Sequence, residues 1–248
     1  MCLAIYKPEG EPIPMNAIKT AWESNPDGAG VAIKDPATPD KPIKIYKGFM
    51  KRKKFLKFLS GIDQSQEMAI HLRYATHGQV VQNLCHPFEI VPGQAAWVHN
   101  GILAGYDKGK LKPMESDTSK FTEEILSRLF STRLDFGQHA GEKLLLERGI
   151  ENSKGIILVS HYESIILNEH LGEWKNGSWF SNMYWDEQLY VPATKTRWQQ
   201  WKPTYTYDQE LLDGDDWAKR ELEVYNQLTE PTPSTGVYRY VNGKRVNL

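Results

Sequence analysis

The chain has 248 residues, and its 30 Lys and Arg residues nearly balance 31 Asp and Glu residues, which gives a formal net charge of −1. This balance argues against a general nucleic-acid binder, which would be basic overall. Two cysteines are too few for a disulfide framework, and no apolar run reaches 18 residues. With no segment that resembles a secretory signal, we expect a cytoplasmic protein without a membrane span.

Apolar runs and turn residues predict strands and helices over the first 190 residues. The expected strands are, in chain order, 2–6, 30–34, 43–46, 68–72, 95–99, 155–160, 164–167 and the arms of a hairpin over 172–180. The expected helices are 14–24, 50–60, 119–130 and 140–148. Because strands outnumber helices and several are joined by hairpins, the residues predict an α+β fold of antiparallel sheet with flanking helices.

The character of the chain changes after about Val191. Aromatic residues there are scattered among charges and prolines, as at Trp198, Trp201 and Trp217. We therefore expect a domain over 2–191 and an irregular, aromatic-rich C-terminal appendage over 192–248. Since Trp and Tyr are enriched at protein interfaces, the appendage is a candidate contact surface.

Cys2 directly follows Met1, so removal of the methionine would place a thiol and a free α-amine on one residue. The reference pKa of a cysteine thiol is about 8.5, and that of an α-amine about 7.7–8.0. A nucleophile and a base would then stand side by side, which is how a weak nucleophile is activated. Position alone does not establish this role.

Polar side chains follow predicted strands or precede a predicted helix in three segments: 71–78, 97–102 and 115–118. Asn100 and Gly101 could donate two hydrogen bonds to an oxyanion, but Asn-Gly is also the strongest short signal for a hairpin turn. Arg73 could bind a carboxylate or form a surface ion pair. Asp117 could bind an ammonium group or, like Ser116, cap the helix that follows.

Four histidines and Cys85 suggest a metal site at first sight: His71, His77, His86 and His99. Their spacing matches no zinc pattern, so we expect no metal. The histidines are instead expected to be core residues or hydrogen-bonding residues around a site. Since no P-loop or Gly-rich nucleotide fingerprint occurs, we also expect no cofactor.

Together these motifs resemble those of the class II glutamine amidotransferases, which are N-terminal-nucleophile (Ntn) hydrolases. The motifs occur in the family's order and rough spacing: Cys2, Asn25–Gly30, His71-x-Arg73-x-Ala75-Thr76-His77-Gly78, His86-Pro87-Phe88, His99-Asn100-Gly101 and Ser116-Asp117-Thr118. The resemblance is densest from Cys2 to about Thr118 and extends to about residue 186. It implies a four-layer αββα sandwich, in which two antiparallel sheets lie between helix layers.

The resemblance also implies a catalytic group. Cys2 is similar to the nucleophile that attacks the side-chain amide carbonyl of L-glutamine, with its own α-amine as the base, through a water. Asn100 and Gly101 match the oxyanion hole. A γ-glutamyl thioester would form, ammonia would leave, and water would release glutamate.

A second set of positions resembles the family's substrate-binding residues. Arg73, with Thr76 alongside, matches the residue that binds the substrate α-carboxylate. Asp117 matches the acceptor for the α-ammonium group. Tyr74 stands where an aromatic residue often occurs, and His86 where a structural histidine does, so both are expected to support the site.

The chain departs from the family in two respects. Ser119 stands where the family often has an acid, which leaves the helix cap without its usual partner. Residues 187–248 are too few and too irregular for an acceptor domain, so the resemblance implies a stand-alone glutaminase that supplies ammonia to a separate synthase protein. The alternatives are a γ-glutamyl amide hydrolase that acts on a larger substrate and a catalytically idle homologue that binds a partner.

Overall fold

The computed structural model describes residues 2–35, 42–75, 79–106, 111–112 and 114–186, and the backbone of 238–241 and 244–247. The chain divides into two units, Met1–Pro192 and Ala193–Leu248. In the second unit, β11 (Tyr238–Val241) pairs with β12 (Lys244–Asn247) in an antiparallel hairpin, two strands that we did not predict. The rest of the expected appendage lies outside the described residues. Among the described residues, every helix is too short or too polar to cross a bilayer.

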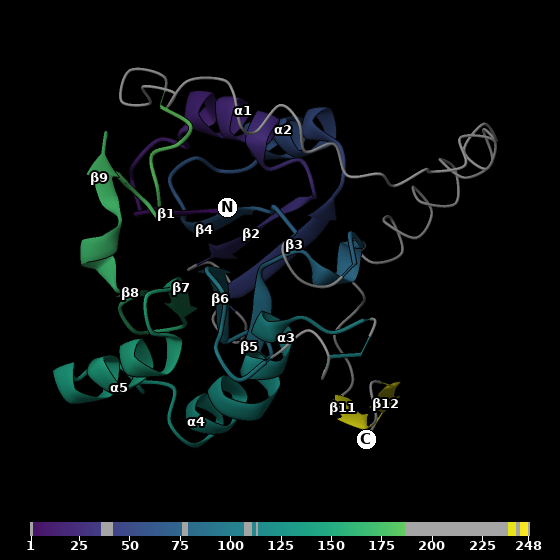
Figure 1. Ribbon diagram of the computed structural model, residues 1–248, viewed down its shortest axis with the longest axis vertical. Helices are drawn as coiled ribbons and strands as arrows, with labels where there is room; N and C mark the ends of the chain where they lie inside the picture. The colour runs from purple at the N-terminus through teal and green to yellow at the C-terminus, as the bar shows by residue number, and fades with distance from the viewer. Residues whose placement is uncertain are drawn as a thin grey trace. The chain divides into compact units, whose positions relative to one another are not determined.

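The first unit contains a six-stranded antiparallel sheet with the order β3-β2-β4-β1-β10-β9 (Figure 1). Its strands are β1 (Leu3–Lys7), β2 (Ala29–Lys34), β3 (Ile43–Phe49), β4 (Glu67–Leu72), β9 (Glu173–Lys175) and β10 (Ser178–Phe180). The first strand of the chain is therefore an inner strand, and Ile5 lies opposite both Ile70 and Phe180. The predicted hairpin turn at Asn176-Gly177 joins β9 to β10, with positive φ at both residues.

A second, four-stranded antiparallel sheet has the order β5-β6-β7-β8. Its strands are β5 (Phe88–Val91), β6 (Ala95–Asn100), β7 (Lys154–Val159) and β8 (Ile165–Leu167). We did not predict β5, because four residues show too little alternation. Asn100 ends β6, whose neighbours are β5 and β7, so Asn100-Gly101 is not a hairpin turn.

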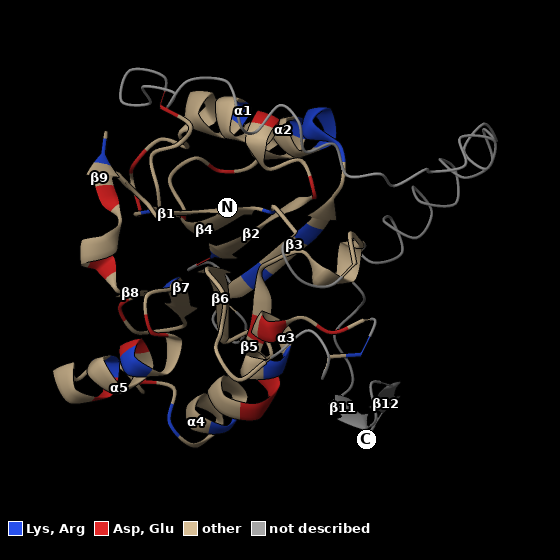
Figure 2. Ribbon diagram, viewed as in Figure 1, with Lys and Arg blue, Asp and Glu red and all other residues tan. Residues whose placement is uncertain are grey.

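Helices cover the outer face of each sheet (Figure 1). On the six-stranded sheet lie α1 (Met15–Ser24) and α2 (Arg52–Gly61), whose buried side chains Trp22 and Phe55 belong to the same core cluster as Leu3. On the four-stranded sheet lie α3 (Asp117–Phe121), the π-helical η3 (Thr122–Leu126), α4 (Ser127–Thr132) and α5 (Ala140–Ile150). These pack on β6 through a cluster that joins Phe130 to Trp97. Figure 2 shows charges of both signs on α5 and none on β6.

The inner faces of the two sheets pack against each other through mainly small or branched side chains. This cluster contains Ala4, Ala32, Ala69, Ala96, Val98, Ile156, Leu158 and Trp179. Alternation along each strand produces the arrangement, since neighbouring residues point to opposite faces of a sheet. The order helix–sheet–sheet–helix confirms the predicted α+β fold with four αββα layers.

Candidate active site

Strand alternation directs Cys2 and Asn100 toward the junction between the two sheets. Leu3 and Ile5 face the helices, so Ala4 and, by the same parity, Cys2 face the other sheet. On β6, Ala96 and Val98 face the six-stranded sheet, which gives Asn100 the same direction. The predicted nucleophile and the predicted oxyanion amide therefore come from different sheets.

Most of the predicted site residues surround one small cavity of about 30 Å³. Its lining residues are Cys2, Arg73, Tyr74, Ala75, Leu84, His86, His99, Gly101, Ser116, Asp117 and Thr118. This volume is room for about one water molecule. Asn100 is buried one residue from Gly101, whereas Thr76 lies outside the described residues.

The Cys2 thiol is held by the backbone of Tyr74. Its Sγ accepts a hydrogen bond from the Tyr74 N–H and donates one to the Tyr74 carbonyl oxygen, both at 3.3 Å. Burial raises the pKa of the Cys2 thiol, against the opposing effects of the Tyr74 hydrogen bond and the Arg73 charge. The resting group is therefore a protonated thiol at neutral pH, and it needs a base to become a nucleophile.

Two residues that we did not predict hold the nucleophile and the amide. Ser181 Oγ accepts hydrogen bonds from Asn100 Nδ2 at 2.7 Å and from the Ala4 N–H at 2.9 Å. Asn182 Nδ2 donates to the Cys2 carbonyl oxygen at 2.8 Å. A polar residue directly after an apolar strand indicates a candidate site residue at other places in this chain, and Ser181 follows β10 in the same way.

Gly101 lies so close to Ser153 that a residue with a side chain would not fit in its place. A Cβ at this position would lie 2.0 Å from Ser153 Oγ, which itself donates to the Ile102 carbonyl oxygen at 3.1 Å. Such an approach requires a residue without a side chain. The backbone N–H of Gly101 can therefore stand beside the cavity that Cys2 lines.

Asp117 is the first residue of α3 and is held by backbone donors. Its Oδ2 accepts from the Leu103 N–H at 3.0 Å and its Oδ1 from the Thr118 N–H at 2.8 Å. An ionised carboxylate has about four acceptor positions, so capacity remains for a substrate ammonium group. The anion also lies at a helix N-terminus, where the helix dipole favours negative charge.

The cap of α3 is complete without an acidic residue. Ser116 is the N-cap, and its Oγ accepts from the Ser119 N–H at 3.1 Å. Ser119 Oγ in turn accepts from the Ser116 N–H at 2.8 Å, which completes a capping box. The cap lacks its usual acidic partner, as expected, and the Ser119 hydroxyl supplies the acceptor that an acid would.

Arg73 is buried beside the turn over 25–28. Its Nη1 donates to the Gln79 carbonyl oxygen at 2.8 Å, and its backbone bonds Gly28 and Asp27. Asp27 Oδ2 also accepts from the Ala75 N–H at 2.8 Å, a positioning role that we did not predict. A guanidinium carries five N–H donors in a planar arrangement, a geometry that matches the two oxygens of a carboxylate.

Three histidines form a buried cluster beside the cavity. The ring centroids of His71 and His86 lie 4.0 Å apart, and His99 Nδ1 lies 3.0 Å from Thr118 Oγ1. Burial lowers the pKa of His71 to about 3 and that of His99 to about 4, so both rings are neutral at physiological pH. Among the described residues, no three or more His, Cys, Asp or Glu side chains are grouped as a metal site.

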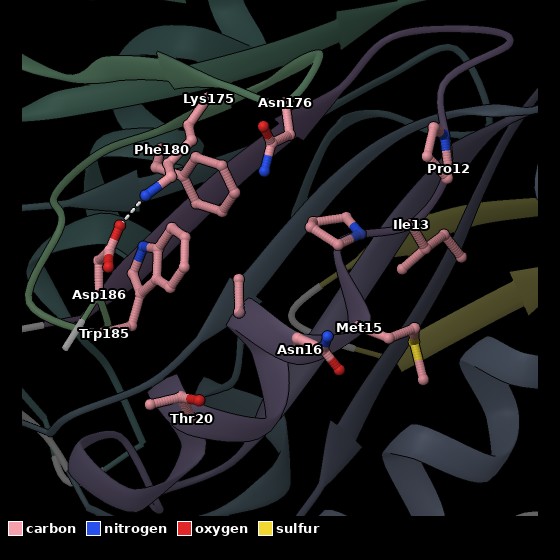
Figure 3. Close-up of a pocket in the computed structure, with 12 residues that line it drawn as sticks. Pro12, Ile13, Met15, Asn16, Thr20, Lys175, Asn176, Phe180, Trp185 and Asp186 are labelled. Carbon is pink, nitrogen blue, oxygen red and sulfur yellow. Dashed lines mark hydrogen bonds and ion pairs between the residues drawn. The ribbon is translucent and has the colours of Figure 1, made fainter. Parts of the chain in front are cut away.

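A larger hollow of about 560 Å³ lies elsewhere, between the start of α1 and the segment around β9 and β10 (Figure 3). Phe180 and Trp185 line it, and an ion pair of Lys175 with Asp186 stands at its edge. None of the predicted site residues lines this hollow.

The sequence is similar to two glutamine–fructose-6-phosphate aminotransferases (isomerizing). It is 30% identical to the protein of Chlorobaculum tepidum over 167 residues, which are 64% of this chain and 27% of that protein. It is 32% identical to the protein of Aquifex aeolicus over 114 residues, 46% of this chain and 18% of that protein. The matched region is thus about a quarter or less of each relative's length.

No family model matches the chain. Among solved structures, the chain matches glutamine phosphoribosylpyrophosphate amidotransferase from B. subtilis complexed with ADP and GMP. The TM-score is 0.44 at 19% identity, and the match covers 73% of this chain and 41% of that chain.

Proposed function

We propose that this chain is a class II glutamine amidotransferase, which hydrolyses the side-chain amide of L-glutamine and releases ammonia for a separate acceptor enzyme. The observation that carries the proposal is the single cavity shared by the Cys2 thiol, Arg73, Gly101 and Asp117. The cavity combines a nucleophile with a positive group for the α-carboxylate of an amino acid and a negative group for its α-ammonium group.

Arg73 and Asp117 would recognise the amino-acid end of glutamine. The guanidinium binds the α-carboxylate, since its parallel N–H groups match the geometry of a carboxylate. The Asp117 carboxylate, already fixed by Leu103 and Thr118, accepts from the α-ammonium group. Because the cavity is smaller than glutamine, its walls must shift when the substrate enters.

Cys2 would then attack the amide carbon. A base removes the thiol proton, a C–S bond forms, and the carbonyl oxygen becomes an oxyanion that accepts from Asn100 Nδ2 and the Gly101 N–H. The C–N bond breaks, and ammonia leaves with the transferred proton. Water then cleaves the γ-glutamyl thioester to glutamate and restores the thiol.

The base in this scheme is the α-amine of Cys2, which requires removal of Met1. Its ordinary pKa of about 7.7–8.0 lies close to neutrality. A nearby base is needed because burial raises the pKa of the thiol. An intact mass of the purified chain that lacks the methionine is therefore the first expected result, whereas retained Met1 would favour the idle homologue.

The direct test compares ammonia and glutamate release from L-glutamine by the wild type, Cys2→Ala and Cys85→Ala. We expect Cys2→Ala to lose activity and the wild type to carry a glutamyl adduct on Cys2 after rapid quenching. Cys85 is the matched control, since it is a buried cysteine that does not line the cavity. Ammonia release that survives Cys2→Ala would contradict the proposal.

Two further measurements test the remaining parts of the proposal. A clear preference for γ-glutamyl amides with larger leaving groups over glutamine would favour the alternative hydrolase. Nitrogen transfer from ¹⁵N-amide glutamine to an acceptor, seen only when a second protein is added, is the expected sign of a separate acceptor enzyme.

A further inference from the structure

The proposed reaction needs the Cys2 thiol and the Asn100 amide at a fixed separation, yet the two residues belong to different sheets. Cys2 precedes β1 of the six-stranded sheet, and Asn100 ends β6 of the four-stranded sheet. Apolar packing between sheets is not directional, so it sets such a distance only coarsely. A hydrogen bond that connects the two elements would fix it.

Ser181 makes this connection. Its side chain is fully buried, and its Oγ accepts at once from Asn100 Nδ2 at 2.7 Å and from the Ala4 N–H at 2.9 Å. Its own N–H donates to the Ala4 carbonyl oxygen at 2.9 Å. Ala4 is thus held on both its N–H and its carbonyl by one residue, which also holds the oxyanion amide.

The next residue extends the same attachment to the nucleophile. Asn182 Nδ2 donates to the Cys2 carbonyl oxygen at 2.8 Å. The segment after β10 therefore holds the backbone of both Cys2 and Ala4, and through the Ser181 hydroxyl it holds Asn100. We propose that Ser181 is a positioning residue that aligns the Asn100 amide with the Cys2 thiol, an inference that rests on the proposed function.

The chemistry of the amide gives the expected consequence. An asparagine Nδ2 carries two hydrogens, and the hydrogen bond to Ser181 directs one of them away from the cavity and leaves the other for the oxyanion. Without the hydroxyl the amide rotates, and the N-terminal segment loses the bond at the Ala4 N–H. Binding of the substrate through Arg73 and Asp117 does not depend on either bond.

The test is a double-mutant cycle with Ser181→Ala, Asn100→Ala and the combined variant, measured as glutaminase kcat and KM and as the single-turnover rate of glutamyl adduct formation on Cys2. We expect Ser181→Ala to lower kcat by about 10–100-fold, as a misplacement of about 1 Å does. KM should change by less than about 3-fold, and in the Asn100→Ala background the extra loss should be under about 2-fold.

Ser178→Ala is the matched control. Ser178 is equally buried on the neighbouring strand β10, and its hydroxyl has no hydrogen-bond partner among the described residues. We expect its kcat to equal that of the wild type. If Ser181→Ala does not fold, Ser181→Cys keeps the volume with a weaker acceptor and should lower kcat in the same direction.

The outcomes separate this inference from the proposed function. Ammonia release that is the same in Cys2→Ala as in the wild type overturns both. Cys2-dependent activity with an unchanged kcat in the folded Ser181 variants overturns the positioning role alone, as does an equal loss in the presence and absence of the Asn100 amide. A lower unfolding temperature with normal kcat shows a purely structural serine and also overturns it.

Discussion

Two hollows among the described residues of the first unit differ in the chemical groups that line them. The larger one, about 560 Å³, is lined by apolar, aromatic and neutral polar side chains, and its charged groups Lys175 and Asp186 pair with each other. The smaller one, about 30 Å³, brings together a thiol, a guanidinium and a carboxylate from separate elements. The site is therefore identified by the convergence of reactive groups and not by the volume of the hollow.

The largest expected effect is on the oxyanion amide. We expect Asn100→Ala to lower the glutaminase kcat by about 10²–10³-fold, because a lost oxyanion donor costs this much. Asn16, which lines the larger hollow, is the matched residue, and Asn16→Ala should leave kcat unchanged. Steady-state ammonia release measures both. Equal losses from the two variants would remove the distinction between the hollows.

The second expected effect is on substrate affinity. We expect Asp117→Asn to raise the KM for glutamine by about 10–100-fold, since a charged hydrogen bond to the α-ammonium group is weakened. Asp186→Asn changes another buried carboxylate, which lines the larger hollow, and should leave KM unchanged. Initial rates over a range of glutamine concentrations test this prediction, which an unaltered KM in Asp117→Asn would contradict.

The histidine cluster beside the smaller cavity makes the free energy of unfolding depend on pH. His71 and His99 stay neutral in the folded chain down to a pH of about 3 and 4, whereas in the unfolded chain both take up protons below about 6.5. The free energy of unfolding is therefore at its full value above pH 6.5 and falls as the pH decreases toward 4. The loss at pH 5.5 is about 1.4 kcal/mol for each histidine.

Urea unfolding over a series of pH values measures this loss. His71→Gln should reduce the pH dependence by one histidine's contribution, about 1.4 kcal/mol at pH 5.5. A variant with the same pH dependence as the wild type would show that His71 is not one of the groups that titrate on unfolding.

The smallest expected effect concerns the helices beside the two hollows. α3 begins with the Ser116–Ser119 capping box, whereas α1 begins after Pro14 without a side-chain cap. We expect Ser119→Ala to lower the free energy of unfolding by about 0.5–1 kcal/mol. Ser60→Ala, at an exposed helix position, should change it by less than about 0.5 kcal/mol. Equal values would show that the cap adds nothing.

Local patterns were sufficient for most of the fold. Continuous apolar runs predicted β1 and β6, and Asn176-Gly177 predicted the turn between β9 and β10. The short strand β5 and the π-helical turn of η3 were not predictable, since neither has a periodicity of its own within four or five residues. Tertiary contacts decide both.

The candidate site was predictable where a motif carried it and not where a contact did. The order of the family's motifs predicted that Cys2 and Asp117 belong to one site, and both residues line the smaller cavity. Ser181 and Asn182 were missed because their partners lie far away in the sequence, with a sequence separation of 177 between Ala4 and Ser181. Such a role follows from strand pairing, which no local pattern encodes.

The inner position of β1 has a consequence for the order of events during synthesis. Of the six strands in this sheet, β1 is synthesised before the others, but one of its two neighbours is β10, and Ile5 meets Phe180 only after the intervening chain exists. Long-range pairing of this kind is slow, because the loop-closure entropy must be lost first. The pairing of β1 with β10 is therefore among the last to form in the six-stranded sheet, and the Cys2 carbonyl reaches Asn182 only when nearly all of the sandwich has been made.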